Sequence, residues 1–129
     1  MRVEDQIREL VARVFQIQPE DLSNRKRNPE FTYARKAYAY LLKRNTKLSL
    51  SQMGLRMNVR AHGSVSTMIS RAYDFLETDK NFKHNVEYIQ NLIDIEKKEP
   101  SEIVKYIMDA IVWDEKGTTR MNLENMFIN

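Results

Sequence analysis

The sequence predicts an all-α fold, and three observations support this prediction. Apolar residues recur at intervals of three and four along most of the chain, which is the spacing of one helix face. The 129 residues include only three glycines and three prolines, so long regular elements are favoured over a turn-rich β fold. No segment has the pattern of a strand. With 42% hydrophobic residues, the chain can bury the core of one domain.

The N-terminal part is expected to form a helix, a short turn and a loop. Residues 3–15 have one apolar face, made of Val3, Ile7, Leu10, Val11 and Val14. Pro19 breaks this helix, and residues 20–22 form a further short turn. The segment SNRKRNPEF, residues 23–31, is polar and basic, and Pro29 is expected to keep it out of regular helix.

Three helices are expected in the middle of the chain. The first covers residues 32–44, with Ala34, Ala37, Tyr38, Leu41 and Leu42 on its inner face. Ser49 followed by Gln52 is a capping-box pattern, which predicts a short helix from Leu50 to about residue 57 or 58. After the turn NVRAHG, a longer helix begins near Ser64 and buries Val65, Met68, Ile69, Ala72 and Leu76.

Two further helices are expected in the C-terminal part, over about residues 81–97 and 101–113. The tail after Gly117 is polar and weakly patterned. We therefore divide the chain into a helical domain over residues 1–97 and a helical extension with a tail over residues 98–129.

Composition restricts the class of protein. The chain has no cysteine, which excludes disulfides and thiolate chemistry and agrees with a reducing compartment. No apolar run is long enough for a membrane span, and no signal-peptide pattern follows Met1. We expect a soluble cytoplasmic protein with no membrane partner.

The charge is unevenly distributed along the chain. Residues 25–71 contain 11 lysines and arginines and a single acidic residue, Glu30, although the net charge of the whole chain is only +3. Such a basic block is typical of a polyanion partner, usually nucleic acid. The simpler alternative is a solvated basic surface without a partner.

No enzyme motif is present. His62 and His84 are the only histidines, and without cysteine or an HExxH pattern a zinc site is not expected. There is no phosphate-binding GxxxxGK[ST] loop, and Ser64 has no nucleophile-elbow context. The sequence therefore predicts a non-enzymatic protein that needs no cofactor and binds no nucleotide.

Residues 50–58 and 64–77 suit the two helices of a helix-turn-helix, whose second helix lies in the DNA major groove. That second helix carries short hydroxyl side chains and one arginine, which are suited to phosphate and base contacts: Ser64, Ser66, Thr67, Ser70 and Arg71. Arg60 and His62 precede it and are candidates for base or backbone contacts, although a histidine in a turn can equally serve only to cap or pack it.

The basic loop is a second candidate for DNA contact. Arg25, Lys26 and Arg27 are adjacent in it, and arginines in such an arm can enter an A/T-rich minor groove. Arg35 and Lys36, at the start of the next helix, would then face phosphate. The alternative is a solvated loop without a ligand.

The chain resembles the C-terminal DNA-binding domain of the bacterial replication initiator DnaA over roughly residues 4–93. The resemblance is carried by IRELVARVFQIQPEDLSNRKRN, by YARKAYAYLLKRNTKLSLSQMGLRM and by VRAHGSVSTMISRAYDFL. It implies a Trp-repressor-like helical fold that contains a helix-turn-helix, with binding of double-stranded DNA.

The resemblance also implies roles for individual residues. Arg27 matches the minor-groove arginine of the family, and Arg35 matches a phosphate-contacting arginine. Ser49 and Leu50 match the backbone-contacting start of the first motif helix. In the family signature GRDHTTV, the arginine, the histidine and the second threonine are matched by Arg60, His62 and Ser64.

The chain departs from the family pattern at the residues that read bases. Ala61 replaces the aspartate of the signature and Gly63 replaces its first threonine. Near the second helix, Tyr33 and Ala34 replace an Arg-Pro pair, and Lys36 replaces a glutamine. These changes imply that phosphate contacts are kept while recognition of the family's A/T-rich initiator box is relaxed or redirected.

Two functions are consistent with the sequence. The first is sequence-influenced binding of double-stranded DNA by a stand-alone domain, as a transcription regulator or as an accessory factor of replication or of a mobile element. The second is a protein interaction module that kept the scaffold and lost DNA binding. It would form a homodimer or bind a partner through the apolar stripe of the helix over 101–113, which includes Ile103, Ile107 and Ile111.

Overall fold

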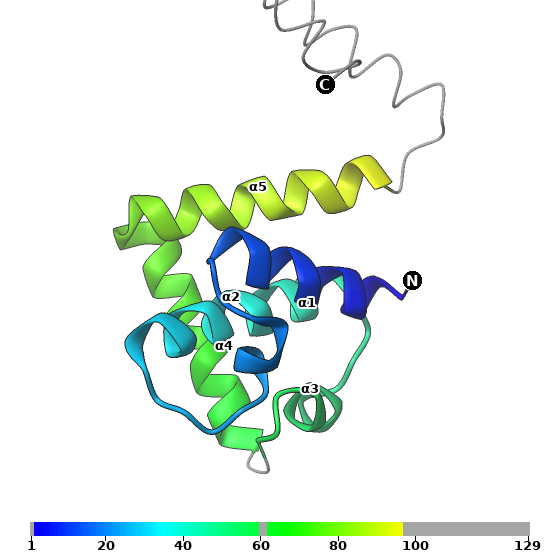
Figure 1. Ribbon diagram of the computed structural model, residues 1–129, viewed down its shortest axis with the longest axis vertical. Helices are drawn as coiled ribbons and strands as arrows, with labels where there is room; N and C mark the ends of the chain where they lie inside the picture. The colour runs from blue at the N-terminus through cyan, green and yellow to red at the C-terminus, as the bar shows by residue number, and fades with distance from the viewer. Residues whose placement is uncertain (1, 60–61, 97–129) are drawn as a thin grey trace, which may run out of the picture. The chain divides into compact units, whose positions relative to one another are not determined.

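The structure is a computed structural model that describes residues 2–59 and 62–96. These residues form helices α1 (Val3–Val14), α2 (Pro29–Asn45), α3 (Leu50–Arg56), α4 (His62–Thr78) and α5 (Lys80–Glu96), with the 3-10 helix η1 (Pro19–Leu22) after α1. No strand occurs among them, which confirms the all-α prediction for this part of the chain (Figure 1). The helix expected over residues 101–113 lies outside the described residues.

The helix boundaries follow the apolar patterns closely, except that two helices begin earlier than expected. Helix α2 begins at Pro29, three residues before its expected start. The prediction that the segment over residues 23–31 stays out of regular helix was therefore right for residues 23–28 and wrong for residues 29–31. Proline suits the first position of a helix because the amide there has no partner inside the helix and the fixed φ of proline is already helical. Helix α4 also begins early, at His62 rather than near Ser64.

Helix α2 is the central element of the fold. It packs against α1, η1 and α4, while α3 packs against α4. Its residues Tyr38, Leu41 and Leu42 are fully buried, and they meet Ile7 and Val11 of α1 in the same core. Three alanines of α2 are also fully buried and let neighbouring elements approach its backbone closely: Ala34, Ala37 and Ala39. Because one helix contacts so many others, its position determines that of the rest.

Helix α5 is fastened by an apolar face and by a pair of amides. The buried apolar face of α5 consists of Phe82, Val86, Ile89 and Ile93. Asn45 at the end of α2 donates a hydrogen bond to the Gln90 side chain (2.8 Å) and accepts one in return (2.9 Å). No helix within residues 2–59 and 62–96 has the length and apolar character that crossing a membrane requires.

Asp79 joins three helices at the junction of α4 and α5. Its Oδ1 accepts the Phe82 N–H (3.0 Å), which caps the start of α5, and its Oδ2 accepts the Tyr33 hydroxyl of α2 (2.7 Å). Both bonds lower the pKa of Asp79, and the bond from the Phe82 N–H has the larger effect. The pKa of Tyr33 is raised, mainly by burial and to a smaller extent by its hydrogen bond to Asp79. The rings of Phe15, Phe75 and Phe82 surround Tyr33 and complete this cluster.

Replacing Asp79 with asparagine is expected to remove part of the pH dependence of stability. A carboxylate whose pKa is depressed in the folded state stabilises the protein above its unfolded pKa of about 4, and this contribution disappears as pH falls through the lower folded value. Thermal unfolding should therefore show Asp79→Asn less stable than the wild type near neutral pH, with the two melting temperatures converging in acid. Tyr33→Phe, which removes one of the two bonds, should show a smaller effect. Curves that stay parallel from neutral to acid pH would refute this role.

Candidate nucleic-acid interface

The turn between α3 and α4 is closed by backbone hydrogen bonds. The Val59 N–H donates to the Gly54 carbonyl (2.7 Å) and the Asn58 N–H donates to the Leu55 carbonyl (3.3 Å), which is a Schellman motif with Asn58 in the left-handed region at φ 57°. A Cβ added to Gly54 would lie 2.5 Å from the Val59 carbonyl oxygen. The close return of the chain over α3 therefore requires glycine at position 54.

Side-chain contacts at both ends of α3 support this geometry. At its start the expected capping box is confirmed: Ser49 Oγ accepts the Gln52 N–H (3.1 Å), and Gln52 Oε1 accepts the Ser49 N–H (2.8 Å). At its end Arg56 forms ion pairs with Glu4 (3.5 Å) and Asp5 (3.3 Å) of α1. Helix α3 is thereby held against the body of the domain, in place to support α4.

Helix α4 presents the predicted row of short polar side chains to solvent. Val65, Ile69 and Ala72 are buried on its inner side. The five predicted DNA-contacting residues within the helix are exposed on its outer side: Ser64, Ser66, Thr67, Ser70 and Arg71. The exposed residues over positions 63–67 are one glycine, two serines and one threonine, all with short side chains. His62 is the first residue of α4, and Arg60 lies outside the described residues.

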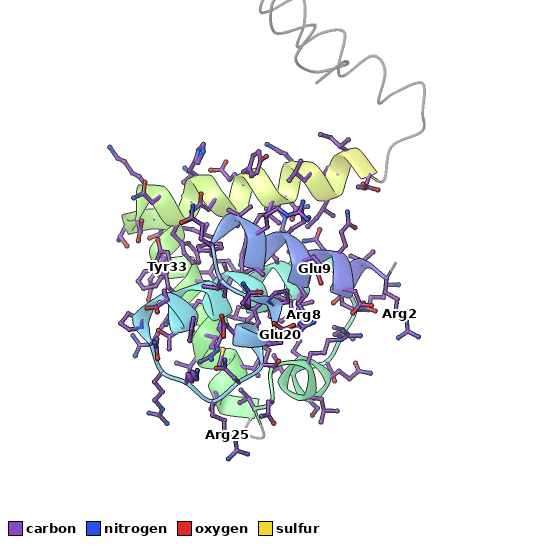
Figure 2. The ribbon with its side chains drawn as sticks, in the orientation of Figure 1. Arg2, Arg8, Glu9, Glu20, Arg25 and Tyr33 are labelled. Atoms are coloured by element: carbon purple, nitrogen blue, oxygen red, sulfur yellow. The ribbon has the colours of Figure 1, made fainter. Side chains whose placement is uncertain are left out.

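The loop between η1 and α2 contributes three further cations. Arg25, Lys26 and Arg27 are all exposed. Figure 2 shows Arg25 projecting outward from this loop, at the end of the described part where α4 begins. The loop and the start of α4 therefore share one face.

Two open grooves lie between the loop, α2 and α4. The larger, of about 510 Å³, has walls from four segments: Asn24, Arg25 and Arg27 in the loop, Thr32 and Arg35 in α2, residues 57–59 in the turn, and Ser64 and Met68 in α4. The smaller, of about 210 Å³, continues from it and is lined by Thr32, Arg35, Lys36, Thr67, Met68 and Arg71. Cations from three separate segments thus border one continuous depression.

Positive charge is concentrated at the smaller groove. Burial, together with the nearby charges of Arg71 and Arg35, lowers the pKa of Lys36. The Lys36 ammonium also lies 5.8 Å from the centre of the Phe75 ring. No carboxylate lines either groove. A surface of this kind attracts an anion of extended shape, because no carboxylate lines the grooves to neutralise the exposed Arg25, Arg27 and Arg71.

Arg35 is buried, which distinguishes it from the other predicted contacts. Its side chain has 7% of its surface exposed. It donates hydrogen bonds to the Asp21 carbonyl from Nε (3.1 Å) and Nη2 (2.9 Å), to the Lys26 carbonyl from Nη1 (2.6 Å) and to Asn24 Oδ1 from Nη2 (2.6 Å). Burial lowers its pKa. The contact of Arg35 with phosphate stays a prediction. These bonds use four of the five N–H groups of the guanidinium and leave one that could donate to a phosphate.

The structure brings together most, but not all, of the predicted site. Ser49 and Leu50 lie at the start of α3, away from the turn, and line neither groove. The exposed residues Lys26, Ser66 and Ser70 also line neither groove. Asn24, Thr32 and residues 57–59 line the larger groove and were not predicted. Only the Asn58 position carried a sequence signal, because asparagine is the residue other than glycine that most often adopts left-handed φ. Within the described residues no group of three or more histidine, aspartate and glutamate side chains is arranged to hold a metal ion.

Comparison with known proteins agrees with this geometry. A family model described as the bacterial dnaA protein helix-turn-helix matches residues 4–71. The chromosomal replication initiator protein DnaA of Aliarcobacter butzleri is 30% identical over 84 residues, which are 65% of this chain and 19% of the relative. The DnaA of Porphyromonas gingivalis is 32% identical over 87 residues, which are 67% of this chain and 18% of the relative.

A third relative, the DnaA of Nautilia profundicola, is 30% identical over 95 residues, covering 74% of this chain and 22% of its own length. The matched region thus spans about a fifth of the length of these initiators. The family model covers α3, the first part of α4 and the residues that line both grooves. The chain therefore belongs to the family of the DnaA C-terminal helix-turn-helix, an all-α DNA-binding domain.

Proposed function

We propose that this chain binds double-stranded DNA with the outer face of α4 in the major groove, and with the 24–27 loop and the start of α2 on the flanking backbone. The observation that carries the proposal is the pair of connected grooves. They are bordered by Arg25, Arg27, Lys36 and Arg71 and by no carboxylate, next to a helix face of short hydroxyl side chains. The hydroxyls permit close approach, and the cations provide partners for phosphate.

The role that best suits this interface is that of a DNA-bound regulator of transcription, or of an accessory factor of replication or of a mobile element. The relatives named above are chromosomal replication initiators, which favours a task connected with replication. Because Ala61 and Gly63 replace the base-reading pair of the family signature, we infer that sequence influences binding without restricting it to the initiator box.

Fluorescence anisotropy with a duplex of random sequence, repeated over a salt series, tests the proposal. Each phosphate neutralised by the protein contributes about 0.9 to the slope of log affinity against log salt concentration, so affinity should fall steeply as salt rises. Arg27→Ala and Arg71→Ala should each weaken binding and reduce that slope by about one unit.

The matched control is Arg13→Ala, since Arg13 is an exposed arginine of α1 that lines neither groove. It should leave both affinity and slope unchanged. Equal behaviour of all three variants would remove the assigned interface, and absence of binding at low salt would remove the proposed function altogether.

A further inference from the structure

We propose that Arg35 is a positioning residue, which holds the 24–27 loop in the shape that presents Arg25, Lys26 and Arg27 to DNA. The inference has two parts. The effect of Arg35 on DNA binding rests on the proposed function. The ordering of the loop by Arg35 concerns the protein without DNA and is tested separately.

The hydrogen bonds of Arg35 reach the end of η1 and two residues of the loop. Two of them converge on the Asp21 carbonyl, at the end of η1, and one reaches the Lys26 carbonyl, five residues further along the chain. The fourth goes to Asn24 Oδ1. A guanidinium has five N–H groups in a planar fork, and four of them are used here on the protein itself. The side chain thus joins the segment before the loop to its middle.

Asn24 completes the network from inside the loop. Its Nδ2 donates to the Asp21 carboxylate (2.9 Å), and its Oδ1 accepts the Lys26 N–H (3.0 Å) as well as the Arg35 bond. Asp21 is in turn bonded to the backbone N–H of Gln18 (3.0 Å). Backbone and side chain of the loop are therefore tied to η1 on one side and to α2 on the other.

The network turns the three neighbouring cations outward. Arg35 and Asn24 occupy the inner side of the loop, whereas Arg25, Lys26 and Arg27 remain exposed. A loop without regular structure would otherwise lose conformational freedom when DNA binds, which costs free energy for each residue that becomes ordered. Because Arg35 orders the loop before DNA arrives, that cost falls on folding instead of on binding.

Lysine cannot replace Arg35 in this task. A lysine ammonium keeps the charge and would serve a simple phosphate contact, but it cannot bond two carbonyl groups and an amide in the fixed directions of the guanidinium fork. Arg35→Lys therefore separates a positioning role from a direct contact with phosphate.

Limited digestion with trypsin tests the loop without DNA. Trypsin cleaves after arginine and lysine, so Arg25, Lys26 and Arg27 report how often the loop opens, and mass spectrometry identifies these sites among the products. We expect cleavage in the loop to be faster by about tenfold or more in Arg35→Lys and in Asn24→Ala, as for the loss of several buried hydrogen bonds. Arg13→Lys, the same substitution on exposed α1, should cleave in the loop at the wild-type rate. Wild-type cleavage in both test variants would overturn the proposal, and Asn24→Ala keeps it testable if Arg35→Lys fails to fold.

Anisotropy with the random duplex then tests the consequence for DNA. Arg35→Lys should bind more weakly than the wild type by about as much as Arg35→Gln, with a salt slope reduced by up to about three units, since three cations are displaced. In a background with Arg25, Lys26 and Arg27 all replaced by alanine, Arg35→Lys should change affinity by less than about twofold. Wild-type affinity of Arg35→Lys, or an equal loss in both backgrounds, would show a direct contact and overturn the positioning role. If the wild type does not bind DNA, the proposed function fails, while digestion still decides whether Arg35 orders the loop.

Discussion

Gly54→Ala is expected to destabilise the domain by about 1–3 kcal/mol and to weaken DNA binding beyond what the loss of stability explains. The new Cβ would lie 2.5 Å from the Val59 carbonyl oxygen, which belongs to backbone and cannot rotate away as a side chain would. The Val59 N–H bond to the Gly54 carbonyl (2.7 Å) would have to lengthen. Since this turn sets the position of α3 against α4, helix α4 would lose its support.

Gly63→Ala is the matched control for this experiment. It makes the same chemical change in the same motif, but a Cβ on Gly63 meets no described atom within 4 Å. Because alanine is also the better helix former by about 1 kcal/mol, the control should be as stable as the wild type or more so. Urea denaturation of the three proteins measures the difference. Equal urea midpoints for Gly54→Ala and the wild type would mean that the turn accommodates the new Cβ without loss of folding free energy, and would contradict this prediction.

The double substitution Ala61→Asp and Gly63→Thr is expected to create a preference for the A/T-rich initiator box. These two changes restore the residues of the family signature that the chain resembles but does not contain. The exposed start of α4 has room for a threonine at position 63. Each good contact to a base edge is worth about 1–3 kcal/mol of discrimination, so the preference for the box over a random duplex should rise by about tenfold or more.

Competition between a labelled box duplex and an unlabelled random duplex measures this preference. Gly63→Ala again serves as control, since it fills the same position without a hydrogen-bonding group and should leave the preference unchanged. If the double variant binds both duplexes equally well, then α4 does not meet base edges in the way that we propose.

The helices themselves were predictable because their apolar residues recur on one face, whatever the rest of the chain does. The start of α2 was not, since proline breaks a helix in its interior but suits its first position, and only the path of the preceding loop decides between the two. For the site, exposed residues of α4 such as Thr67 and Arg71 followed directly from the helix period. Arg35 was predicted to contact phosphate at the surface. Its burial could not be foreseen, because its hydrogen-bond partners are mainly backbone carbonyls, which every residue has. The steric role of Gly54 could not be predicted, because it depends on how closely the Val59 carbonyl returns over α3.

Helix α2 supplies the core with Tyr38, Leu41 and Leu42 and the grooves with Thr32, Arg35 and Lys36, whereas the outer row of α4 contributes nothing to the core. The two helices therefore differ in what a substitution would change. A substitution of a core or groove residue of α2 would alter folding and binding together. Substitutions at Ser66, Thr67 or Ser70 remove no buried side chain, so on the function that we propose they would change the contacts with DNA and leave the scaffold in place.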